Sequence, residues 1–476
     1  MLRDRNLELD NECIFDKCKF TLSEIVEFII WLNKIIVHNR RIRFYDCKGG
    51  CYQCIRKGDE WFCISKFLSE SVISDMAPKD IRTLIDMLYF SPTLNYDGEF
   101  DSFENLINVQ NGVIDSVTGK LIPHDAKYYF TSCLNASYIE NPSIYDAPAY
   151  RHFCKTSLGD IPQKIKLSRQ ILGYVCSSYT KVKKAFAIIG EKNSGKSKYL
   201  ELTEMIIGED NVCNIDLDKL GNRFNVAEFS RNKVNISAEL SLEPLKDPTM
   251  FKKLVGGDRV QAEDKGQNPF KFKNKCKFLF GGNGLPSLKS QDTSQAFLSR
   301  LVILYFPDEI PESERDPDLD EKLYEERNII FSLAVRELPE LISNNFIFEM
   351  PDDEQKYLRA YSDETNQIQN FIADRCIMSP DAVCRTSTLY DAYKDYCKNN
   401  CLFAHSMTAF SKAIACVKGI EHHRLTVRGV RYRGFKGIDI NTDFLNEQDS
   451  ESEYSFIKNS EKPVPSDRTG RRKFFG

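Results

Sequence analysis

The octapeptide GEKNSGKS at Gly190–Ser197 constrains the fold of this chain more than any other feature. It matches the pattern G-x-x-x-x-G-K-[ST], in which glycines let the backbone turn tightly between a strand and a helix. An apolar stretch, AFAIIG at 185–190, precedes the loop, and an amphipathic stretch, KSKYLELTEMIIG at 196–208, follows it. The pattern therefore predicts a buried strand, a glycine-rich loop and a helix, in the order found in α/β proteins.

The chemistry of this loop favours a bound polyphosphate. Backbone N–H groups at the start of a helix point at an anion, and the helix dipole adds to the attraction. Lys196 would bring a positive charge to the β- and γ-phosphates, and the Ser197 hydroxyl would bind Mg²⁺. The sequence thus predicts a P-loop that binds ATP and Mg²⁺ through Gly190, Asn193, Ser194, Gly195, Lys196 and Ser197.

Three polar residues beside later apolar stretches complete the predicted catalytic set with Lys196. Glu239, in KVNISAEL, would bind Mg²⁺ together with Ser197 or activate water, and Asn283, at the end of KCKFLFGGN, would orient that water. Arg300 precedes LVILYF and would neutralise transition-state charge across a subunit boundary. Taken singly, these residues also fit an exposed loop, a turn and a surface ion pair, so the prediction depends on their order along the chain.

Composition limits the class of protein. Lys and Arg total 65 and Asp and Glu total 69, which gives a net charge of −4 and excludes a uniformly basic nucleic-acid binder. The start, MLRDRNLELDNECIF, lacks the apolar core of a signal peptide, and no apolar stretch is long enough to span a bilayer. The 16 scattered cysteines favour reduced thiols. We therefore expect a soluble, cytoplasmic protein without membrane contacts.

The pattern of apolar residues divides the chain into five parts. Strand-like and helix-like stretches alternate over 184–306, which predicts an α/β domain with a parallel sheet. A helix is expected over 21–38, and the acidic stretch 307–356, with 16 Asp or Glu against 5 Lys or Arg, is expected to be a solvated helical region. The expected parts are a small α+β domain at 1–100, a strand and helical region at 101–180, the P-loop domain at 181–350, a winged-helix domain at 360–440 and a disordered tail at 441–476.

Two basic clusters stand out from the acidic average. The first, at 252–277, has 8 Lys or Arg against 3 acids. A hairpin with Lys265 at its turn is expected here, and the alternative for the lysine-bearing strand after it is an exposed face that only adds solubility. DNA contacts are expected from Lys265 and from one strand face that carries Lys271, Lys273, Lys275 and Lys277.

The second basic cluster, at 412–436, has 7 Lys or Arg against one acid, Glu421. It falls in the expected winged helix, whose cationic wing would contact the phosphates of duplex DNA. The alternative is a winged helix that docks a protein. The DNA-binding residues expected here are Arg428, Arg431 and Arg433.

Four cysteines in the first part of the chain leave two interpretations open. The spacing Cys51-x-x-Cys54 suits a zinc site, with Cys47 and Cys63 as further candidate ligands. The same stretch, CYQCIRKGDEWFCI, also alternates as a hairpin in which cysteines pack as small apolar residues. The hairpin is the favoured interpretation.

Several stretches together resemble one known family. GEKNSGKS and KVNISAEL are similar to its first two motifs, and FKKLVGGDRVQAEDKGQNPFKFKNKCKFLFGGNGLP to its linked B′ and C motifs. SRLVILYFPDEIPESERDPDLDEKLYEE is similar to its finger-arginine strand and the helix after it. The family is the superfamily III helicases, in the branch of phage and plasmid primase–helicases and the poxvirus-type NTPase. The resemblance covers roughly 100–440, with single residues, Glu239 and Arg300, where the family often has pairs.

This resemblance implies a P-loop, AAA+-like ATPase core and a hexameric ring with a hairpin from each subunit in a central channel. It implies an ATP-dependent DNA helicase of a phage, plasmid or viral replication system, located in the host cytoplasm, that translocates on one DNA strand. Implied partners are single-stranded and duplex DNA, further copies of the chain, and a separate primase or polymerase. The alternative is a DNA-binding initiator or scaffold that uses ATP as an assembly switch without unwinding. The basic clusters disfavour a metabolic P-loop kinase.

Overall fold

The computed structural model describes residues 14–441 except for 39–40, 57, 242–244, 246–247, 266–267, 287–295, 366, 401, 403, 416 and 428–429. The described residues form two compact units, one up to Leu358 and one from Arg359 onwards. The tail expected at 441–476 lies, beyond Asn441, outside the described residues. No helix in the described part of the chain combines the length and apolar character needed to cross a bilayer.

A small α+β region begins the first unit. Helix α1 (Leu22–Leu32) starts at Thr21, which forms a capping box with Glu24, and ends at Asn33 in the left-handed conformation. The helix expected over 21–38 is therefore too long, because Ile35–His38 forms strand β1 and buries its apolar side chains. The remaining elements of this region are β2 (Arg41–Asp46), β3 (Cys51–Cys54), α2 (Glu60–Ile64), α3 (Glu70–Asp75) and α4 (Pro78–Tyr89).

A short meander and two helices connect this region to the central sheet. The meander is antiparallel, and Asn108 on its first strand donates from Nδ2 to the Gly49 carbonyl at 2.7 Å. The elements are β4 (Leu106–Val109), β5 (Gly112–Asp115), β6 (Lys120–Ile122), α5 (Pro148–Leu158) and α6 (Pro162–Cys176).

The centre of the first unit is a five-stranded sheet of order β13-β7-β12-β9-β8, in which every neighbouring pair is parallel. The α/β class and the parallel sheet predicted from the sequence are thus confirmed. Two of its strands, β7 and β12, are buried along their whole length, as expected for strands covered on both faces. The strands are β7 (Ala185–Gly190), β8 (Val212–Cys213), β9 (Val234–Ser237), β12 (Lys277–Gly282) and β13 (Leu301–Phe306).

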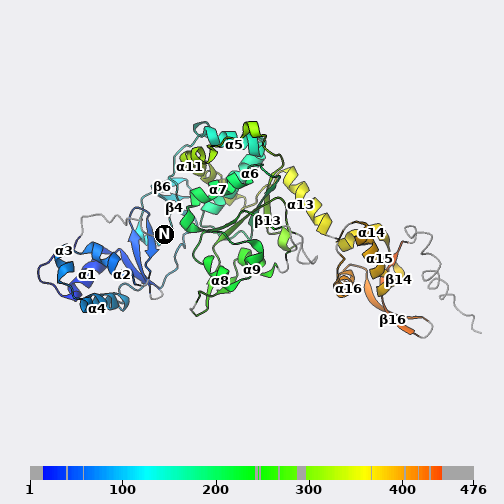
Figure 1. The fold of residues 1–476 in the computed structure, drawn as a ribbon, viewed down its shortest axis with the longest axis horizontal. Coiled ribbons are helices and arrows are strands. Elements are labelled where there is room, and N and C mark those ends of the chain that lie inside the picture. The colour runs from blue at the N-terminus through cyan, green and yellow to red at the C-terminus, as the bar shows by residue number, and fades with distance from the viewer. Residues whose placement is uncertain are drawn as a thin grey trace, which may run out of the picture. The chain divides into compact units, whose positions relative to one another are not determined.

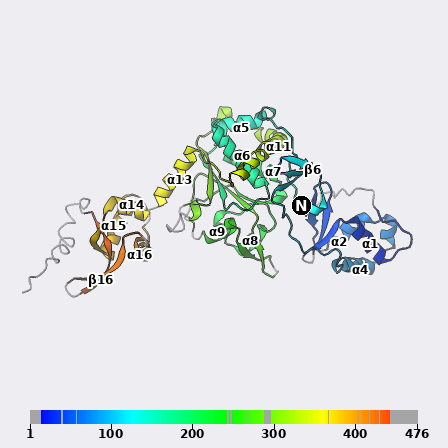
Figure 2. The ribbon, with the colours of Figure 1, turned by 180° about the vertical axis from the view of Figure 1, so that it is seen from behind.

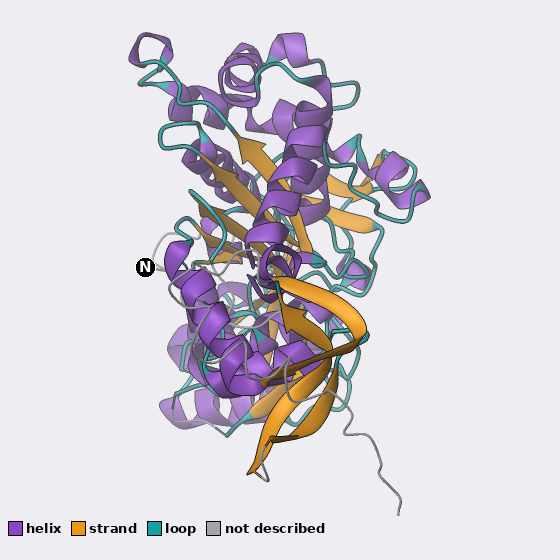
Figure 3. Ribbon diagram, turned by 90° about the vertical axis from the view of Figure 1, so that its right-hand side faces the viewer, coloured by secondary structure: helices purple, strands orange, loops and turns teal. Residues whose placement is uncertain are grey.

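Helices cover both faces of this sheet (Figure 1, Figure 3). On one face α11 (Leu319–Val335) packs with α6 and with α7 (Lys196–Ile207), and the Tyr199 hydroxyl of α7 donates to the Ser168 carbonyl of α6 at 2.7 Å. On the other, Phe229 after α8 (Arg223–Glu228) contacts the ring of Phe278, and Phe251 on α9 (Thr249–Gly256) contacts that of Phe280. The result is a three-layer arrangement in which the helices cover the faces of the sheet and ligands can bind at the ends of the parallel strands.

Helix α11 corrects one expectation. The acidic stretch 307–356 was expected to be solvated, yet α11 buries its second half, including Phe331 and Ala334, against α6 and α7. Its acidic residues lie mostly in its first half, so the charge count of the whole stretch concealed an apolar face. A shorter helix, α12 (Leu338–Ser343), follows it.

Strand β13 lies at the edge of the sheet, and the start of α13 (Asp352–Thr365) covers its outward backbone groups. Ile303 N–H donates to Met350 Sδ at 3.4 Å, and Tyr305 N–H donates to Glu354 Oε1 at 3.2 Å. These contacts satisfy donors that an open sheet edge would offer to another chain.

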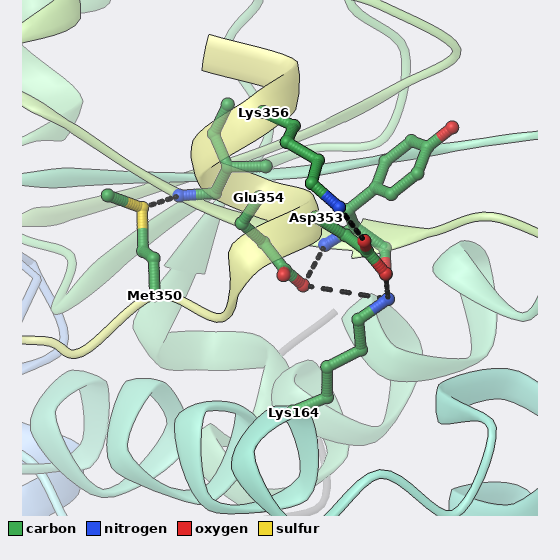
Figure 4. A network of polar contacts seen from close by, with 7 residues as sticks. Lys164, Met350, Asp353, Glu354 and Lys356 are labelled. Atoms are coloured by element: carbon green, nitrogen blue, oxygen red, sulfur yellow. Dashed lines mark hydrogen bonds and ion pairs between the residues drawn. The ribbon is translucent and has the colours of Figure 1, made fainter. Parts of the chain in front are cut away.

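Lys164 on α6 completes this edge contact (Figure 4). Its Nζ donates to the Tyr305 carbonyl at 3.3 Å and lies 3.8 Å from Glu354 Oε1 and 3.7 Å from Asp353 Oδ2. Lys164 is 1% exposed and Glu354 is fully buried, and burial raises the pKa of Glu354. Each of these two buried groups is therefore the buried charge partner of the other.

The second unit packs three helices on a three-stranded antiparallel sheet (Figure 2). Its core includes Phe371, Tyr393, Phe410 and Phe435. The structure adds a strand, β14, that the sequence pattern did not indicate. The elements are α14 (Gln367–Arg375), β14 (Cys376–Arg385), α15 (Thr386–Asn399), α16 (Met407–Ala415), β15 (Glu421–Val427) and β16 (Val430–Ile440).

Glu354→Ala should destabilise the first unit by about 3–5 kcal/mol, because it leaves the Lys164 ammonium buried with only the half-exposed Asp353 nearby. A lower urea midpoint of unfolding would measure the loss. The matched control is Glu340→Ala, which removes the exposed partner of Lys166, also on α6, and should cost no more than about 1 kcal/mol. Equal losses in the two variants would contradict the assignment.

Candidate functional site

The loop Gly190–Ser197, called the glycine-rich loop below, connects strand β7 to helix α7. Asn193 and Gly195 have positive φ, 58° and 99°, and Gly195 is the N-cap of α7. No side chain caps this helix end. Its first backbone N–H groups are thus available to an anion in front of the helix.

Two glycines are required by close contacts. A Cβ at Gly190 would lie 1.9 Å from the Phe306 carbonyl oxygen, and one at Gly195 would lie 2.1 Å from Ser157 Oγ. Both distances are far below any real contact, so these positions exclude a side chain. These two positions of the motif therefore need glycine both for the close packing against β13 and α5 and for the backbone conformation.

Lys196 and Ser194 are held against the start of the loop. The Ser194 hydroxyl donates to the Glu191 carbonyl at 2.7 Å, and Lys196 Nζ donates to the same carbonyl and to Ser194 Oγ. Lys196 is half-buried, and burial lowers its pKa. Ser197 is exposed in the first turn of α7. Both predicted phosphate and metal contacts thus lie at the mouth of the loop.

The segment after β13 braces the glycine-rich loop. Glu191 N–H donates to the Phe306 carbonyl at 3.1 Å, and Ile310 N–H donates to the Asn193 carbonyl at 3.1 Å. Glu309 Oε1 accepts from Asn193 Nδ2 and from Arg315 Nη2, each at 2.9 Å. These hydrogen bonds lower the pKa of Glu309. The sequence analysis missed the Glu309–Arg315 pair because it treated the acidic stretch only as a solvated surface.

Glu239 and Asn283 lie at the same end of the parallel strands as this loop. Gly282 of β12 is level with Ile189 of β7, and Phe280 is level with Ser237, the last residue of β9. Leu240 N–H donates to the Gly281 carbonyl at 2.6 Å, which keeps the chain after β9 beside the end of β12. Glu239 and Asn283 are both exposed there. The parallel sheet thus gathers Lys196, Glu239 and Asn283 at one edge.

These residues suit a magnesium–nucleotide complex by their chemistry. A hydroxyl (Ser197) and a carboxylate (Glu239) are oxygen ligands of the kind that Mg²⁺ binds together with phosphates and water. Among the described residues, no group of three or more His, Cys, Asp or Glu side chains is placed to hold a metal ion. A site here would therefore take its remaining ligands from the nucleotide and from water.

Arg300 lies at the opposite end of the parallel strands. Its carbonyl accepts from Ala185 N–H at 2.7 Å at the start of β7, whereas the loop follows the end of β7. The six paired residues between the two edges span about 20 Å, at ~3.3 Å per residue. The side chain is half-buried and donates from Nη1 to the Ala296 carbonyl at 2.5 Å. Arg300 therefore cannot reach the glycine-rich loop of its own chain.

The predicted hairpin is formed by β10 (Arg259–Ala262) and β11 (Phe270–Lys273). Arg259 pairs with Lys273 and Gln261 with Lys271, and all four side chains are exposed. Lys265 is exposed in the turn. One face of the hairpin is thus cationic.

Lys275 and Lys277 do not continue this face, so that expectation is wrong. Lys275 lies in the connection after β11 and pairs with Glu99 at 2.7 Å. Lys277 is the first residue of β12 and is only 7% exposed. Alternation in the sequence suggested one strand, but the chain leaves one sheet and enters another between Lys273 and Lys277.

The second unit carries its cations on the hairpin of β15 and β16. Arg424 pairs with Arg433, and Thr426 pairs with Arg431. Arg424, Arg431 and Arg433 are exposed, and Arg428 lies outside the described residues. Like charges placed opposite each other repel, which suits a surface that meets a polyanion.

The cysteine stretch 51–63 is not a hairpin. Cys51 and Cys54 lie on β3, which pairs with β2, and Cys63 lies on helix α2. The favoured interpretation is therefore wrong for the second half of the stretch, where EWFCI is helical. Cys51 and Cys63 are buried among apolar residues of two different clusters.

Two family models match parts of the chain. Residues 188–300 match one described as "Family of unknown function (DUF5906)", and residues 79–161 match one described as "D5 N terminal like". The first match contains Lys196, Glu239, Asn283 and Arg300. The region matched by this model therefore includes candidate site residues from both ends of the strands.

Solved structures share the fold. The A form apo structure of the NrS-1 C terminal region aligns with a TM-score of 0.51 at 10% identity, over 89% of this chain and 100% of that one. An apo structure of the same region gives a TM-score of 0.51 at 11% identity and the same coverage. At such identities the likeness shows a common fold.

Gly195→Ala should lower the stability of the first unit by about 1–3 kcal/mol, because the new Cβ meets Ser157 and φ is in the left-handed region. Urea unfolding measures the change. Gly221→Ala is the control, since a Cβ there meets no heavy atom within 4 Å. A Gly195→Ala protein as stable as the control would refute the packing argument.

Proposed function

We propose that this chain is an ATP-dependent DNA helicase of a phage, plasmid or viral replication system. It acts as a ring-shaped oligomer, a hexamer, that translocates on one DNA strand. The match to the D5 N terminal like model and the likeness to the NrS-1 C terminal region support the broader assignment to phage and viral replication proteins. The single observation that carries the finer proposal is the gathering of Lys196, Glu239 and Asn283 at one edge of the sheet, with Arg300 at the other.

In this proposal the central sheet and glycine-rich loop form a P-loop, AAA+-like ATPase core. Backbone N–H groups of the loop and Lys196 bind the phosphates of ATP, and Ser197 and Glu239 bind Mg²⁺, which neutralises charge on the transferred phosphoryl group. Glu239 and Asn283 orient the attacking water. The burial of these side chains agrees with the roles: Ser197, Glu239 and Asn283 are exposed, and Lys196 is half-buried at the mouth of the loop.

Arg300 then acts on the nucleotide of a neighbouring subunit. The strand length between Arg300 and its own loop supports this role, because a guanidinium must contact the phosphoryl group to stabilise transition-state charge. Its partly buried position and the hydrogen bond to Ala296 would hold it at a subunit boundary. The nucleotide site is thus complete only in the oligomer.

DNA contacts are proposed at the two cationic hairpins. Lys265, Lys271 and Lys273 on the β10–β11 hairpin would contact the phosphates of the translocating strand. The second unit is proposed to be a winged helix, and its order of helix, strand, two helices and two strands supports this. Arg431 and Arg433 on its hairpin would contact duplex DNA, with Arg428 in the same connection.

Lys196→Ala and Arg300→Ala should each lower DNA-stimulated ATP hydrolysis at least about a hundredfold, because each removes a charge that stabilises the transition state. Mixing the two variants should restore activity, since about one junction in four of a randomly mixed ring joins an intact loop to an intact arginine. Phosphate release measures both effects. Lys198→Ala, two residues along α7, is the control and should stay active. A mixture as inactive as its components would exclude action across subunits.

Lys265→Ala separates the helicase from the alternative, a DNA-binding initiator or scaffold that does not unwind. The cationic hairpin of the second unit is the observation that favours this alternative. For a helicase, Lys265→Ala should abolish strand separation and leave duplex binding unchanged, because the two contacts lie on different units. Lys120→Ala, an exposed lysine on β6, is the control in both assays. Wild-type protein that hydrolyses ATP and binds duplex DNA but separates no strands would establish the alternative.

A further inference from the structure

A second candidate site lies at the edge of the sheet opposite the glycine-rich loop. It is a cavity of about 170 Å³ between the starts of β9 and β12. The chain after α6, at Ser177 and Ser178, and the chain before β9, at 230–233, form its walls. Because β9 and β12 run parallel to β7, this cavity and the loop are separated by the length of the strands.

Two lysines without carboxylate partners line this cavity. Lys277 is 7% exposed, and its Nζ donates to the Ser177 carbonyl and lies 4.9 Å from the centre of the Tyr174 ring. Lys233 is half-buried beside the start of β9. Within the described residues, neither ammonium forms an ion pair with Asp or Glu. Burial and, as the next cause, the positive charge of Lys233 together lower the pKa of Lys277 to about 7.

The other charges of the lining do not balance these two. Arg231 is paired with Asp264 and Lys275 with Glu99, whereas Lys273 is exposed without an ion pair among the described residues. Asp101 is the one acid of the lining, and its carboxylate accepts from Thr131 N–H at 3.0 Å and from the Thr131 hydroxyl at 2.5 Å. The cavity is therefore cationic, with hydroxyl-bearing residues between the charges.

Electrostatics and size indicate what such a cavity accepts. Two ammonium groups in a poorly solvated space repel each other, and an anion between them removes this repulsion. The volume holds several waters, since one water needs about 10–15 Å³, but it is below the ~300 Å³ at which pockets begin to enclose whole organic ligands. A single phosphate group satisfies both limits.

We propose that this cavity binds a phosphate group through Lys233 and Lys277. It is a second anion site, separate from the glycine-rich loop and independent of the proposed ATP hydrolysis. The phosphate comes from free phosphate or from a nucleic-acid backbone, which present the same chemistry. Lys273 belongs both to the lining and to the exposed cationic face of β11, so a strand on that face would pass the cavity.

The test measures the melting temperature of the Lys196→Ala protein at fixed ionic strength and pH 7, so that the glycine-rich loop contributes little phosphate binding. The probes are inorganic phosphate, single-stranded oligothymidine, and oligothymidine with an uncharged methylphosphonate backbone. Binding to the folded state raises the melting temperature with ligand concentration. A rise with inorganic phosphate assigns a free-phosphate site, and a rise only with the charged oligonucleotide assigns a backbone site.

Lys277→Met and Lys233→Gln, each added to Lys196→Ala, should abolish that rise. Lys277→Met places an apolar side chain of similar length in the buried position. Lys233→Gln changes the same site at a half-buried position, where a substitution disturbs folding less. The test can therefore be read from either variant, provided that it folds. The control is Lys166→Gln, which changes a half-buried lysine on α6 that pairs with Glu340, and it should retain the full rise. The proposal is overturned if no probe raises the melting temperature, or if both cavity variants respond like the control.

Discussion

Parallel pairing in the central sheet decides which side chains of this chain can act together. β7, β9 and β12 are parallel and end close to one another, so Gly190 at the end of β7, Glu239 beyond β9 and Asn283 beyond β12 lie at the same end of the strands. Arg300 and Lys233, which precede β13 and β9, and Lys277, the first residue of β12, lie at the other end. In a parallel sheet all carboxyl ends lie on the same side, and the strand length keeps the two groups apart. Each residue's proposed role follows from the end of the strand at which it lies.

The strands that separate the two edges also connect them. β12 begins with the buried Lys277 and is followed by Asn283, and β13 is preceded by Arg300 and leads to Glu309, which braces the glycine-rich loop. Close-packed strands of this kind move as rigid elements. Under the proposed function, hydrolysis of the nucleotide would therefore shift residues at the subunit boundary and beside the cationic hairpin. The cover of β13 by Glu354 and Lys164 holds the edge strand in this arrangement.

Errors of the sequence interpretation have particular physical causes. Ile35–His38 continues the apolar pattern of α1, but β-branched residues after the left-handed Asn33 pair with β2 instead. The count of charges over 307–356 described a surface, whereas the second half of α11 is buried. Lys275 and Lys277 keep the alternation of Lys271 and Lys273, but a change of sheet separates them. In each case a local pattern was correct, and a distant contact decided its meaning.

Local residue patterns suffice to predict the elements on which the candidate site is built. The glycine-rich loop, the apolar strands beside it and the position of Lys196 follow from residue types within a short stretch, because backbone conformation and burial depend on near neighbours. Other relations appear only once the chain is folded: Arg300 lies a strand length from its own loop, Glu309 and Arg315 brace that loop, and Lys233 and Lys277 share a cavity. These relations depend on strand order and on contacts between residues far apart in the chain, which no local pattern encodes.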